Sequence, residues 1–358
     1  MNKTEIAVVG GGPAGMCAAL AAANQGAKVT LFDSAKILGG QLIKQTHRFF
    51  GSEKENAGTR GIEICAMLED EIKNNKNIDL HLDATVISLY HRNEIGIEEK
   101  KKYGLYGYDR IVLATGASEK MLVFANNDMP GVYGAGAVQT LMNVHGVVPG
   151  KRVVMIGSGN IGLIVSYQLM QAGVKVAAIV EAAPNIGGYR VHASKVRRMK
   201  VPILTSHTIL KAIGDECVTA AQICEVDERF QPVAGTEQTI DCDIICLSVG
   251  LSPLTELMWP VGCKMKFVPQ LGGNVPLRDE HMETTVRGVY VAGDACGVEE
   301  ATAAMIEGKI AGLSAAASIG HDKDYAKLYE ECVEDITNLR AGPVGAKIRQ
   351  GLDSLKEV

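Results

Sequence analysis

The chain has 358 residues, and its 36 basic and 41 acidic side chains give a net charge of −5 and a pI near 6.0. This mildly acidic balance argues against nucleic acid as a partner, and no apolar run is long enough to span a bilayer. The length is sufficient for two substantial hydrophobic cores.

The nine cysteines form neither a CxxC pair nor a set with metal-ligand spacing. Most lie in apolar surroundings, which indicates reduced, buried side chains rather than a disulfide framework. We therefore expect no metal and no iron–sulfur cluster. The first predicted strand begins within a few residues of Met1, so neither a signal peptide nor a transit peptide is expected. Together these features predict a cytoplasmic protein.

The chain opens with an apolar strand at residues 6–9, the glycine pattern GGGPAG at 10–15 and an Ala-rich helical stretch. In such a pattern the first glycine forms the turn, the second lets backbone approach a pyrophosphate, and the third lets the helix pack on the strand. The pyrophosphate then lies at the helix N-terminus. The strand at 28–32 ends on an acid that can bind a ribose. The dinucleotide ligands expected here are Gly10, Gly12, Pro13, Ala14, Gly15 and Asp33.

Residues 78–108 alternate apolar and polar side chains around turns, which predicts a small antiparallel meander. The charged run at 98–102 is expected at a solvated hairpin tip. The strand at 110–113 and the following turn at 114–116 close this first unit.

A second strand–glycine–helix pattern, GSGNIG at 157–162, follows an apolar strand at 153–156. The strand at 176–180 again ends on an acid, Glu181, which would repel a 2′-phosphate, so this site is expected to prefer NADH over NADPH. The predicted ligands are Gly157, Gly159, Asn160, Ile161, Gly162 and Glu181. The unit ends at a strand at 244–248 and a Gly250 turn, which repeats the ending of the first unit.

The last segment contains a strand at 288–291, the turn Ala292-Gly293-Asp294, and an Ala-rich helix at 299–317. A tail at 322–358 is expected to form two polar amphipathic helices broken at Gly342-Pro343. The repeated βαβ units predict two three-layer α/β domains. Two dinucleotide sites in one chain suggest electron transfer from one dinucleotide to the other.

The order of these landmarks resembles the flavoproteins with two dinucleotide-binding domains, which hold FAD in the first site and NAD(P)H in the second. The resemblance covers essentially the whole chain. It implies a thioredoxin-reductase-like α/β architecture of two Rossmann-like three-layer (ββα) domains, with the NAD domain inserted in a split FAD domain. The expected boundaries are 1–118 and 251–320 for the FAD domain, 119–250 for the NAD(P)H domain, and 321–358 for a helical tail.

The resemblance also implies further cofactor contacts. Asp294 would bind the FAD ribitol, and the helix that begins near Thr302 would point its N-terminus at the pyrimidine end of the flavin. The other implied contacts are Gly40, Gln41, Thr115, Gly116, Gly250 and Gly293. In the flavin-proximal stretch 41–50, His47 is the residue that can move a proton near neutral pH, so it is the catalytic candidate, with a structural role as the alternative.

A working thioredoxin reductase carries its CxxC at the position of residues 130–137, where this chain has no thiol, so disulfide reduction is excluded. Cys296 follows Asp294 and is expected to be a packed small residue. The basic cluster Arg190, Arg197, Arg198 and Lys200 is expected on an exposed helix face rather than as a 2′-phosphate clamp.

The stretches 39–52 and 130–143 are similar to a narrower group: the flavin subunits of hydrogen cyanide synthase, opine oxidase, dye-linked L-proline dehydrogenase and the sarcosine oxidase α chain. This resemblance implies an FAD-dependent, NADH-linked oxidoreductase subunit in an oligomer or hetero-complex. It would move electrons between nicotinamide and a second flavoprotein or a small carrier, in amine or imino-acid dehydrogenation. Two alternatives remain: a stand-alone NADH:acceptor reductase of the diaphorase or ferredoxin-reductase type, and a non-catalytic nucleotide-binding scaffold.

Overall fold

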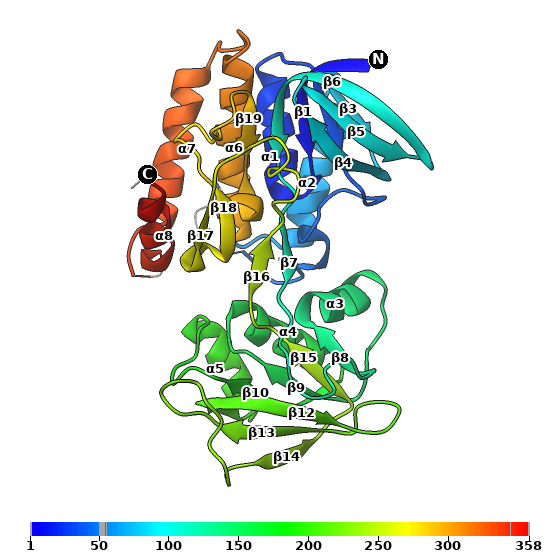
Figure 1. The fold of residues 1–358 in the computed structure, drawn as a ribbon, viewed down its shortest axis with the longest axis vertical. Coiled ribbons are helices and arrows are strands. Elements are labelled where there is room, and N and C mark those ends of the chain that lie inside the picture. Colours follow the sequence, from blue (N-terminus) through cyan, green and yellow to red (C-terminus); the bar gives the residue numbers. More distant parts are fainter. Residues whose placement is uncertain (1, 50–53, 55, 344, 357–358) are drawn as a thin grey trace. The chain divides into compact units, whose positions relative to one another are not determined.

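The computed structural model describes residues 2–49, 54, 56–343 and 345–356, and the chain divides into two compact units (Figure 1). Unit 1 comprises Met1–Ser118 and Ser252–Val358, and unit 2 comprises Glu119–Leu251. Strands β7 (Ala117–Glu119) and β16 (Leu251–Pro253) contain the two points at which the chain passes between the units. Unit 2 is therefore an insertion in unit 1.

The first segment of unit 1 supplies most of its central sheet. Strand β6 joins two kinds of pairing, because its first half is antiparallel to β5 while its second half is parallel to β1 and β19. The innermost strands are buried on both faces, as parallel strands covered by other layers are. The elements are β1 (Asn2–Val9), α1 (Pro13–Asn24), β2 (Val29–Phe32), η1 (Leu42–Lys44), α2 (Gly61–Asn74), β3 (Ile78–His81), β4 (Ala84–Tyr90), β5 (Glu94–Glu99) and β6 (Lys102–Leu113).

The meander predicted at residues 78–108 is wrong at its start. Strand β3 pairs in parallel with β2 as an edge of the main sheet, and only β4, β5 and β6 form the antiparallel meander. The hairpin tip is confirmed, with Lys100 and Lys101 in the turn between β5 and β6.

The second segment of unit 1 completes this sheet and adds helices. Helix α6 packs against α1, and α7 packs against α6 (Figure 1). Helix α8 covers the β17–β18 hairpin through an apolar cluster. The elements are β17 (Met265–Val268), η4 (Pro269–Leu271), β18 (Gly273–Pro276), β19 (Val289–Val291), η5 (Gly293–Cys296), α6 (Ala301–Ala317), α7 (Tyr325–Leu339) and α8 (Ala346–Lys356).

Unit 2 consists of three layers. A parallel sheet in the order β11-β10-β9-β15-β8 has helices against one core and the antiparallel sheet β12-β13-β14 against another. The elements are β8 (Val132–Gly134), α3 (Ala135–Gln139), the π-helix η3 (Thr140–Val144), β9 (Arg152–Ile156), α4 (Asn160–Gln171), β10 (Lys175–Glu181), α5 (Arg190–Arg198), β11 (Ile203–Thr205), β12 (His207–Ile213), β13 (Ala220–Glu225), β14 (Gln238–Asp241) and β15 (Ile244–Leu247).

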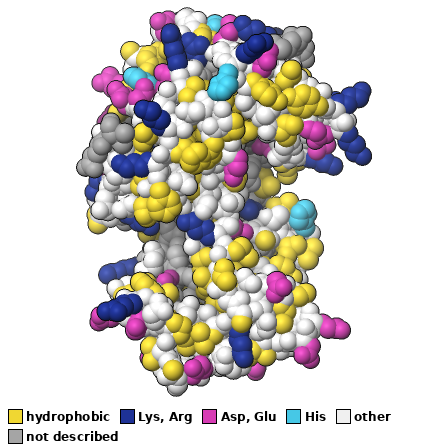
Figure 2. All heavy atoms as spheres, in the orientation of Figure 1, with side chains coloured by type: hydrophobic (Ala, Val, Ile, Leu, Met, Phe, Trp, Pro, Cys, Tyr) yellow, Lys and Arg dark blue, Asp and Glu magenta, His cyan; other side chains and the backbone are white. Residues whose placement is uncertain are grey.

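The first segment of unit 1 and the whole of unit 2 each contain a βαβ unit, then a meander, and then a strand that pairs with the first strand of that βαβ unit. Among the helices described, none combines the length and apolar character needed to cross a membrane. On the face shown in Figure 2, basic and acidic side chains are interspersed.

Candidate dinucleotide sites

The fold itself requires the first and last glycines of each pattern, which are Gly10 and Gly15 in unit 1 and Gly157 and Gly162 in unit 2. A Cβ on Gly10 would clash with the carbonyl oxygen of Ala114, and one on Gly157 would clash with that of Ser248. A Cβ on Gly15 or Gly162 would meet the carbonyl of the first glycine of its own pattern. These glycines let the turn and the following helix pack against the neighbouring strand ends.

The middle glycines are different. Gly12 has φ −78° and ψ −174°, and Gly159 has φ −64° and ψ 176°, which are conformations open to any residue. A Cβ on Gly12 would meet only the Cα of Gly40, at 4.0 Å, and a Cβ on Gly159 would have no atom within 4 Å. The fold does not need glycine at either position, so each leaves an open cradle at a helix N-terminus. Such a cradle fits a pyrophosphate, which needs close approach to backbone N–H groups.

Each acid at the end of the second strand is tied to the glycine loop of its own unit. Asp33 accepts hydrogen bonds from the backbone N–H of Gly11 and, at 2.6 Å, from that of Ala35. Glu181 accepts from the N–H and hydroxyl of Ser158, at 2.8 and 2.7 Å, and from the N–H of Ala183 at 2.9 Å. The carboxylates are therefore fixed beside the cradles, where a ribose would lie.

A second glycine pair approaches each cradle, six residues after the acid. The N–H of Gly39 donates to the carbonyl of Gly11 at 2.8 Å, and the N–H of Gly188 donates to that of Ser158 at 2.9 Å. A Cβ on Gly40 would lie 2.9 Å from the Cα of Gly12. Sequence reasoning found the pair at 39–40 but missed Gly187-Gly188, although the equal offset from the acid was a usable signal.

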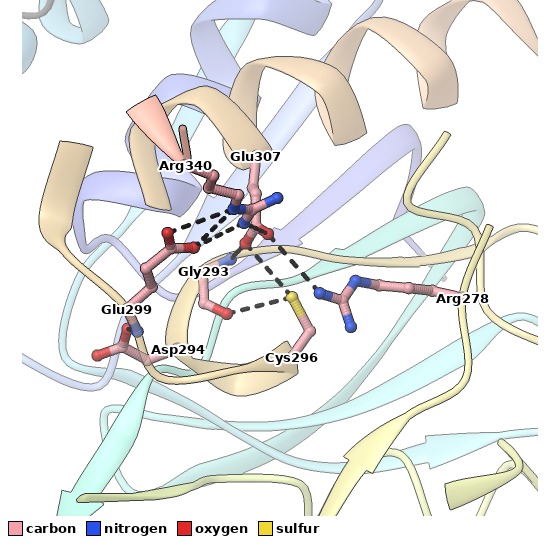
Figure 3. A network of polar contacts seen from close by, with 7 residues as sticks. All are labelled: Arg278, Gly293, Asp294, Cys296, Glu299, Glu307 and Arg340. Carbon is pink, nitrogen blue, oxygen red and sulfur yellow. Dashed lines mark hydrogen bonds and ion pairs between the residues drawn. The ribbon is translucent and has the colours of Figure 1, made fainter. Parts of the chain in front are cut away.

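The Gly293-Asp294 turn belongs to the same unit as the first cradle. Gly293 has φ +70°, and a Cβ there would lie 2.8 Å from the Cβ of Ala14 in α1. Asp294 accepts the N–H of Glu299 at 3.2 Å (Figure 3). Burial raises the pKa of Asp294 to about 6, with the nearby carboxylates of Glu299 and Glu307 acting in the same direction.

The other predicted residues lie at turns and helix starts. The hydroxyl of Thr115 donates to the carbonyl of Leu254 at 2.7 Å, and the carbonyl of Gly116 accepts the N–H of Leu254, so these residues join the two segments of unit 1. Thr302 is buried in the first turn of α6, and Gln41 is exposed before η1.

In unit 2, the amide oxygen of Asn160 accepts the N–H of Tyr189 at 2.8 Å, which joins the second glycine loop to the start of α5. Ile161 is exposed in the first turn of α4. The carbonyl of Gly250 accepts the N–H of Lys120 at 2.9 Å, at the end of this unit.

A sequence model of the pyridine nucleotide-disulphide oxidoreductases matches residues 4–308. The chain belongs to the pyridine nucleotide-disulphide oxidoreductase family. This flavoprotein is therefore an oxidoreductase, and the predicted fold class is confirmed by its two α/β units with Rossmann-like sheets and by solved structures of the same fold. Thioredoxin reductase from T. acidophilum superposes with a TM-score of 0.73 over 89% of this chain and 99% of its own, at 23% identity. L-proline dehydrogenase from P. horikoshii superposes with a TM-score of 0.70 over 93% of this chain and 59% of its own, also at 23% identity.

Curated relatives of this oxidoreductase match it along most of its length. An opine oxidase subunit of Rhizobium meliloti is 29% identical over 88% of this chain and 63% of its own. The hydrogen cyanide synthase subunit HcnB of Pseudomonas protegens is 26% identical over 86% of this chain and 69% of its own. The alpha subunit of sarcosine oxidase from Rhizobium meliloti is 26% identical over 85% of this chain and 29% of its own. The chain spans just under two thirds of the opine oxidase subunit.

His47 stacks on Phe49, with ring centroids 5.9 Å apart and an interplanar angle of 21°. Phe49 is buried in the core of unit 1, whereas Phe50 lies outside the described residues. The stack is a packing contact of His47. Its part in proton transfer stays a prediction.

The oxidoreductase contains no disulfide among its nine cysteines, and eight of them are buried. The Cys296 thiol donates to the carbonyl of Gly293 at 3.1 Å and lies 3.5 Å from the Glu307 carboxylate. Burial raises the pKa of this thiol well above its usual value. A buried, protonated thiol agrees with the predicted packing role.

In the segment at residues 130–137, where a thioredoxin reductase would carry its CxxC, a carboxylate binds backbone N–H groups. Glu119 accepts the backbone N–H of Gly136 at 2.6 Å and that of Ala137 at 3.2 Å. The predicted basic face is also present, because His192, Ala193 and Val196 are the buried side of α5. The cluster predicted at residues 190–200 is exposed on the other side.

Proposed function

We propose that this oxidoreductase is a cytoplasmic subunit that binds FAD in unit 1 and NADH in unit 2. It moves electrons between the nicotinamide and a partner flavoprotein or small carrier, in the dehydrogenation of an amine or imino acid. The relatives named as subunits of opine oxidase, sarcosine oxidase and hydrogen cyanide synthase support both the hetero-complex and the substrate class.

The observation that carries the proposal is the open space at Gly12 and Gly159. Neither position needs glycine for backbone conformation or packing, yet each lies where a helix N-terminus faces outward. Two such cradles, each beside a fixed carboxylate, are suited to two dinucleotides. Glycines that served only as turns would be confined, as Gly10 and Gly157 are.

In unit 1, Gly12 and the first turn of α1 would hold the FAD pyrophosphate, and Asp33 would accept hydrogen bonds from the adenosine ribose. Asp294 would accept a hydrogen bond from the ribityl chain. The first turn of α6, which contains Thr302, would place the positive end of the helix dipole at the pyrimidine end of the flavin, where negative charge develops on reduction. FAD, when bound, supplies the hydride acceptor and the store of electrons.

In unit 2, Gly159 and the first turn of α4 would hold the nicotinamide dinucleotide. The carboxylate of Glu181 is held in place by Ser158 and Ala183. It would accept a hydrogen bond from the 2′-hydroxyl of NADH and repel the 2′-phosphate of NADPH. No general acid or base is required for a hydride transfer between the two cofactors.

The test is an anaerobic titration of the purified protein with NADH and, separately, NADPH, which follows the bleaching of bound flavin. We expect stoichiometric bleaching by NADH at much lower concentration than by NADPH. Affinity purification of the tagged chain from its own cells would show whether a second flavoprotein copurifies. A protein that turns over NADH with dyes and has no partner would be the stand-alone reductase. A protein whose flavin no nicotinamide bleaches would contradict the proposal and favour a scaffold.

Gly12→Ala and Gly159→Ala form a matched pair for the same experiment. Both should fold with unchanged stability, because the added methyl group contacts nothing closer than 4.0 Å. Gly12→Ala should lose FAD affinity by about tenfold or more, whereas Gly159→Ala should keep FAD and lose bleaching by NADH to a similar extent. Equal effects of both variants on FAD content would contradict the assignment of one cofactor to each unit.

A further inference from the structure

Four charged side chains meet in the interior of unit 1 beside the Gly293-Asp294 turn (Figure 3). Arg278 and Glu307 are 6% and 5% exposed, and Glu299 and Arg340 are each 14% exposed. They come from distant parts of the chain: Arg278 follows β18, Glu299 precedes α6, Glu307 lies in α6, and Arg340 ends α7.

Arg340 makes the shortest contacts in this group. Its Nε lies 3.0 Å and its Nη2 2.7 Å from Oε2 of Glu299, and the same Nη2 lies 2.6 Å from Oε1 of Glu307. Arg278 is farther away, with Nη2 at 3.7 Å from Oε1 of Glu307. Buried carboxylates are costly without a partner, so both glutamates depend mainly on Arg340 for their charge and their orientation.

The two glutamates in turn hold the turn that carries Asp294. Oε2 of Glu307 accepts the backbone N–H of Gly293 at 3.0 Å. The backbone N–H of Glu299 donates to Oδ1 of Asp294 at 3.2 Å. Arg340 therefore holds both residues that contact the turn, although none of its own described hydrogen bonds reaches Gly293 or Asp294.

We propose that Arg340 is a positioning residue of the flavin site, through which helix α7 fixes the Gly293-Asp294 turn. This inference rests on the proposed binding of FAD in unit 1. Arg340 lies beyond residues 4–308, the stretch matched by the family's sequence model, so family membership assigns it no role. The tail is thus part of the cofactor site rather than an appendage.

Helix α7 does not depend on Arg340 for its place on the unit. Cys332 and Ile336 are buried in the core, and the hydroxyl of Tyr329 donates to the carbonyl of Glu280 at 3.1 Å. A substitution at Arg340 should therefore leave the helix docked and loosen the turn beneath it.

The test compares Arg340→Met and Arg340→Lys with Lys327→Met, an exposed position on the same helix. The first measurement is hydrogen exchange of the peptide spanning residues 292–300 in protein stripped of FAD. The second is the FAD dissociation constant from flavin fluorescence. In Arg340→Met we expect faster exchange in that peptide and at least about tenfold weaker FAD binding. Arg340→Lys should recover part of both effects, and Lys327→Met should match the wild type.

A second variant, Glu299→Gln with Arg340→Met, removes one charge of each sign. It should bind FAD more tightly than Arg340→Met alone, because fewer buried charges are left unpaired. If Arg340→Met does not fold, Arg340→Lys decides, and wild-type exchange and affinity in that variant overturn the proposal. Wild-type FAD affinity in folded Arg340→Met overturns it as well. A wild-type protein that binds no FAD overturns the proposed function, and this inference with it.

Discussion

Gly308 of α6 lies directly against the carbonyl oxygen of Ala14 in α1, and a Cβ on Gly308 would overlap that oxygen. One turn later, Gly312 lies in the same way against the carbonyl of Ala18. Small residues on both helices allow their backbones to approach closely. Helix α6, which contains Thr302 and Glu307, is thereby placed against α1, the helix that begins at the first cradle. Two segments nearly 300 residues apart in the chain therefore pack side by side in unit 1.

Gly308→Ala should therefore destabilise unit 1, even though alanine is the better helix former. Overpacking of this kind costs about 1–3 kcal/mol, against a gain of roughly 1 kcal/mol from helix propensity. We expect a lower melting temperature and weaker FAD binding, because α6 must move away from α1. Lys309→Ala, on the next residue of the same helix, is the control. A melting temperature for Gly308→Ala at or above that of the wild type would show that the contact is not tight.

The parts of the fold that could be predicted from sequence are those set by local backbone geometry. A strand, a glycine turn and a helix need fixed spacings, so the patterns that begin at Gly10 and Gly157 located both cradles. The acids Asp33 and Glu181 followed from the length of a helix plus a strand. The repetition of the whole pattern, together with the resemblance to flavoproteins with two dinucleotide-binding domains, also predicted that one unit is inserted in the other.

The parts that could not be predicted depend on contacts distant in sequence. The alternation at residues 78–81 fits a parallel edge strand as well as an antiparallel one, so β3 was misassigned. Arg340 looks like an ordinary polar residue at the end of an amphipathic helix, and nothing local indicates its contact with Glu307, 33 residues earlier. Buried ion pairs between helices leave no periodic signal in either helix.

Nucleotide preference gives a direct test of Glu181. Glu181→Gln removes the negative charge, so the preference for NADH over NADPH should fall roughly tenfold, as expected for a repulsion of about 1–2 kcal/mol. The measurement is the ratio of the two nucleotide concentrations that half-reduce the flavin under anaerobic conditions. Ser158→Ala is the control, because it removes a hydrogen bond to Glu181 and keeps the charge. An unchanged ratio in Glu181→Gln would mean that another group selects the nucleotide.

Thiol labelling separates a packed Cys296 from a reactive one. Cys217 is exposed, whereas the other eight cysteines are buried, and burial raises the pKa of Cys17 to about 12. Iodoacetamide should therefore label native protein at Cys217 and reach the other thiols only after unfolding. Peptide mass spectrometry reads the labelled positions, and Cys217→Ser provides the blank. Rapid labelling of Cys296 in the folded protein would contradict its packing role and restore a redox role to consideration.

Asp294 makes the stability of the FAD-free protein depend on pH in a particular direction. Burial raises the pKa of its carboxyl group from 3.8 to about 6. Below pH 3.8 the group is protonated in both the folded and unfolded chain, so it contributes no penalty. Between pH 3.8 and 6 the unfolded chain ionises while the folded protein keeps the group protonated, so stability falls progressively, and above pH 6 the folded protein holds a buried charge that the unfolded chain solvates freely. The folded state then loses about 3 kcal/mol.

Asp294→Asn removes this titration and keeps an oxygen that can accept the N–H of Glu299. We expect the melting temperatures of variant and wild type, both without FAD, to be close at pH 4. At pH 7 the variant should melt about 5–10 °C higher. FAD should bind more weakly to Asp294→Asn than to the wild type, because the amide is a poorer acceptor for a ribityl hydroxyl than a carboxylate. Asp70→Asn, at an exposed position of α2, controls for the loss of one charge. An Asp294→Asn variant that is less stable than the wild type at pH 7 would show that the carboxylate is stabilised in the FAD-free protein, and that the turn is not held in readiness for a ligand.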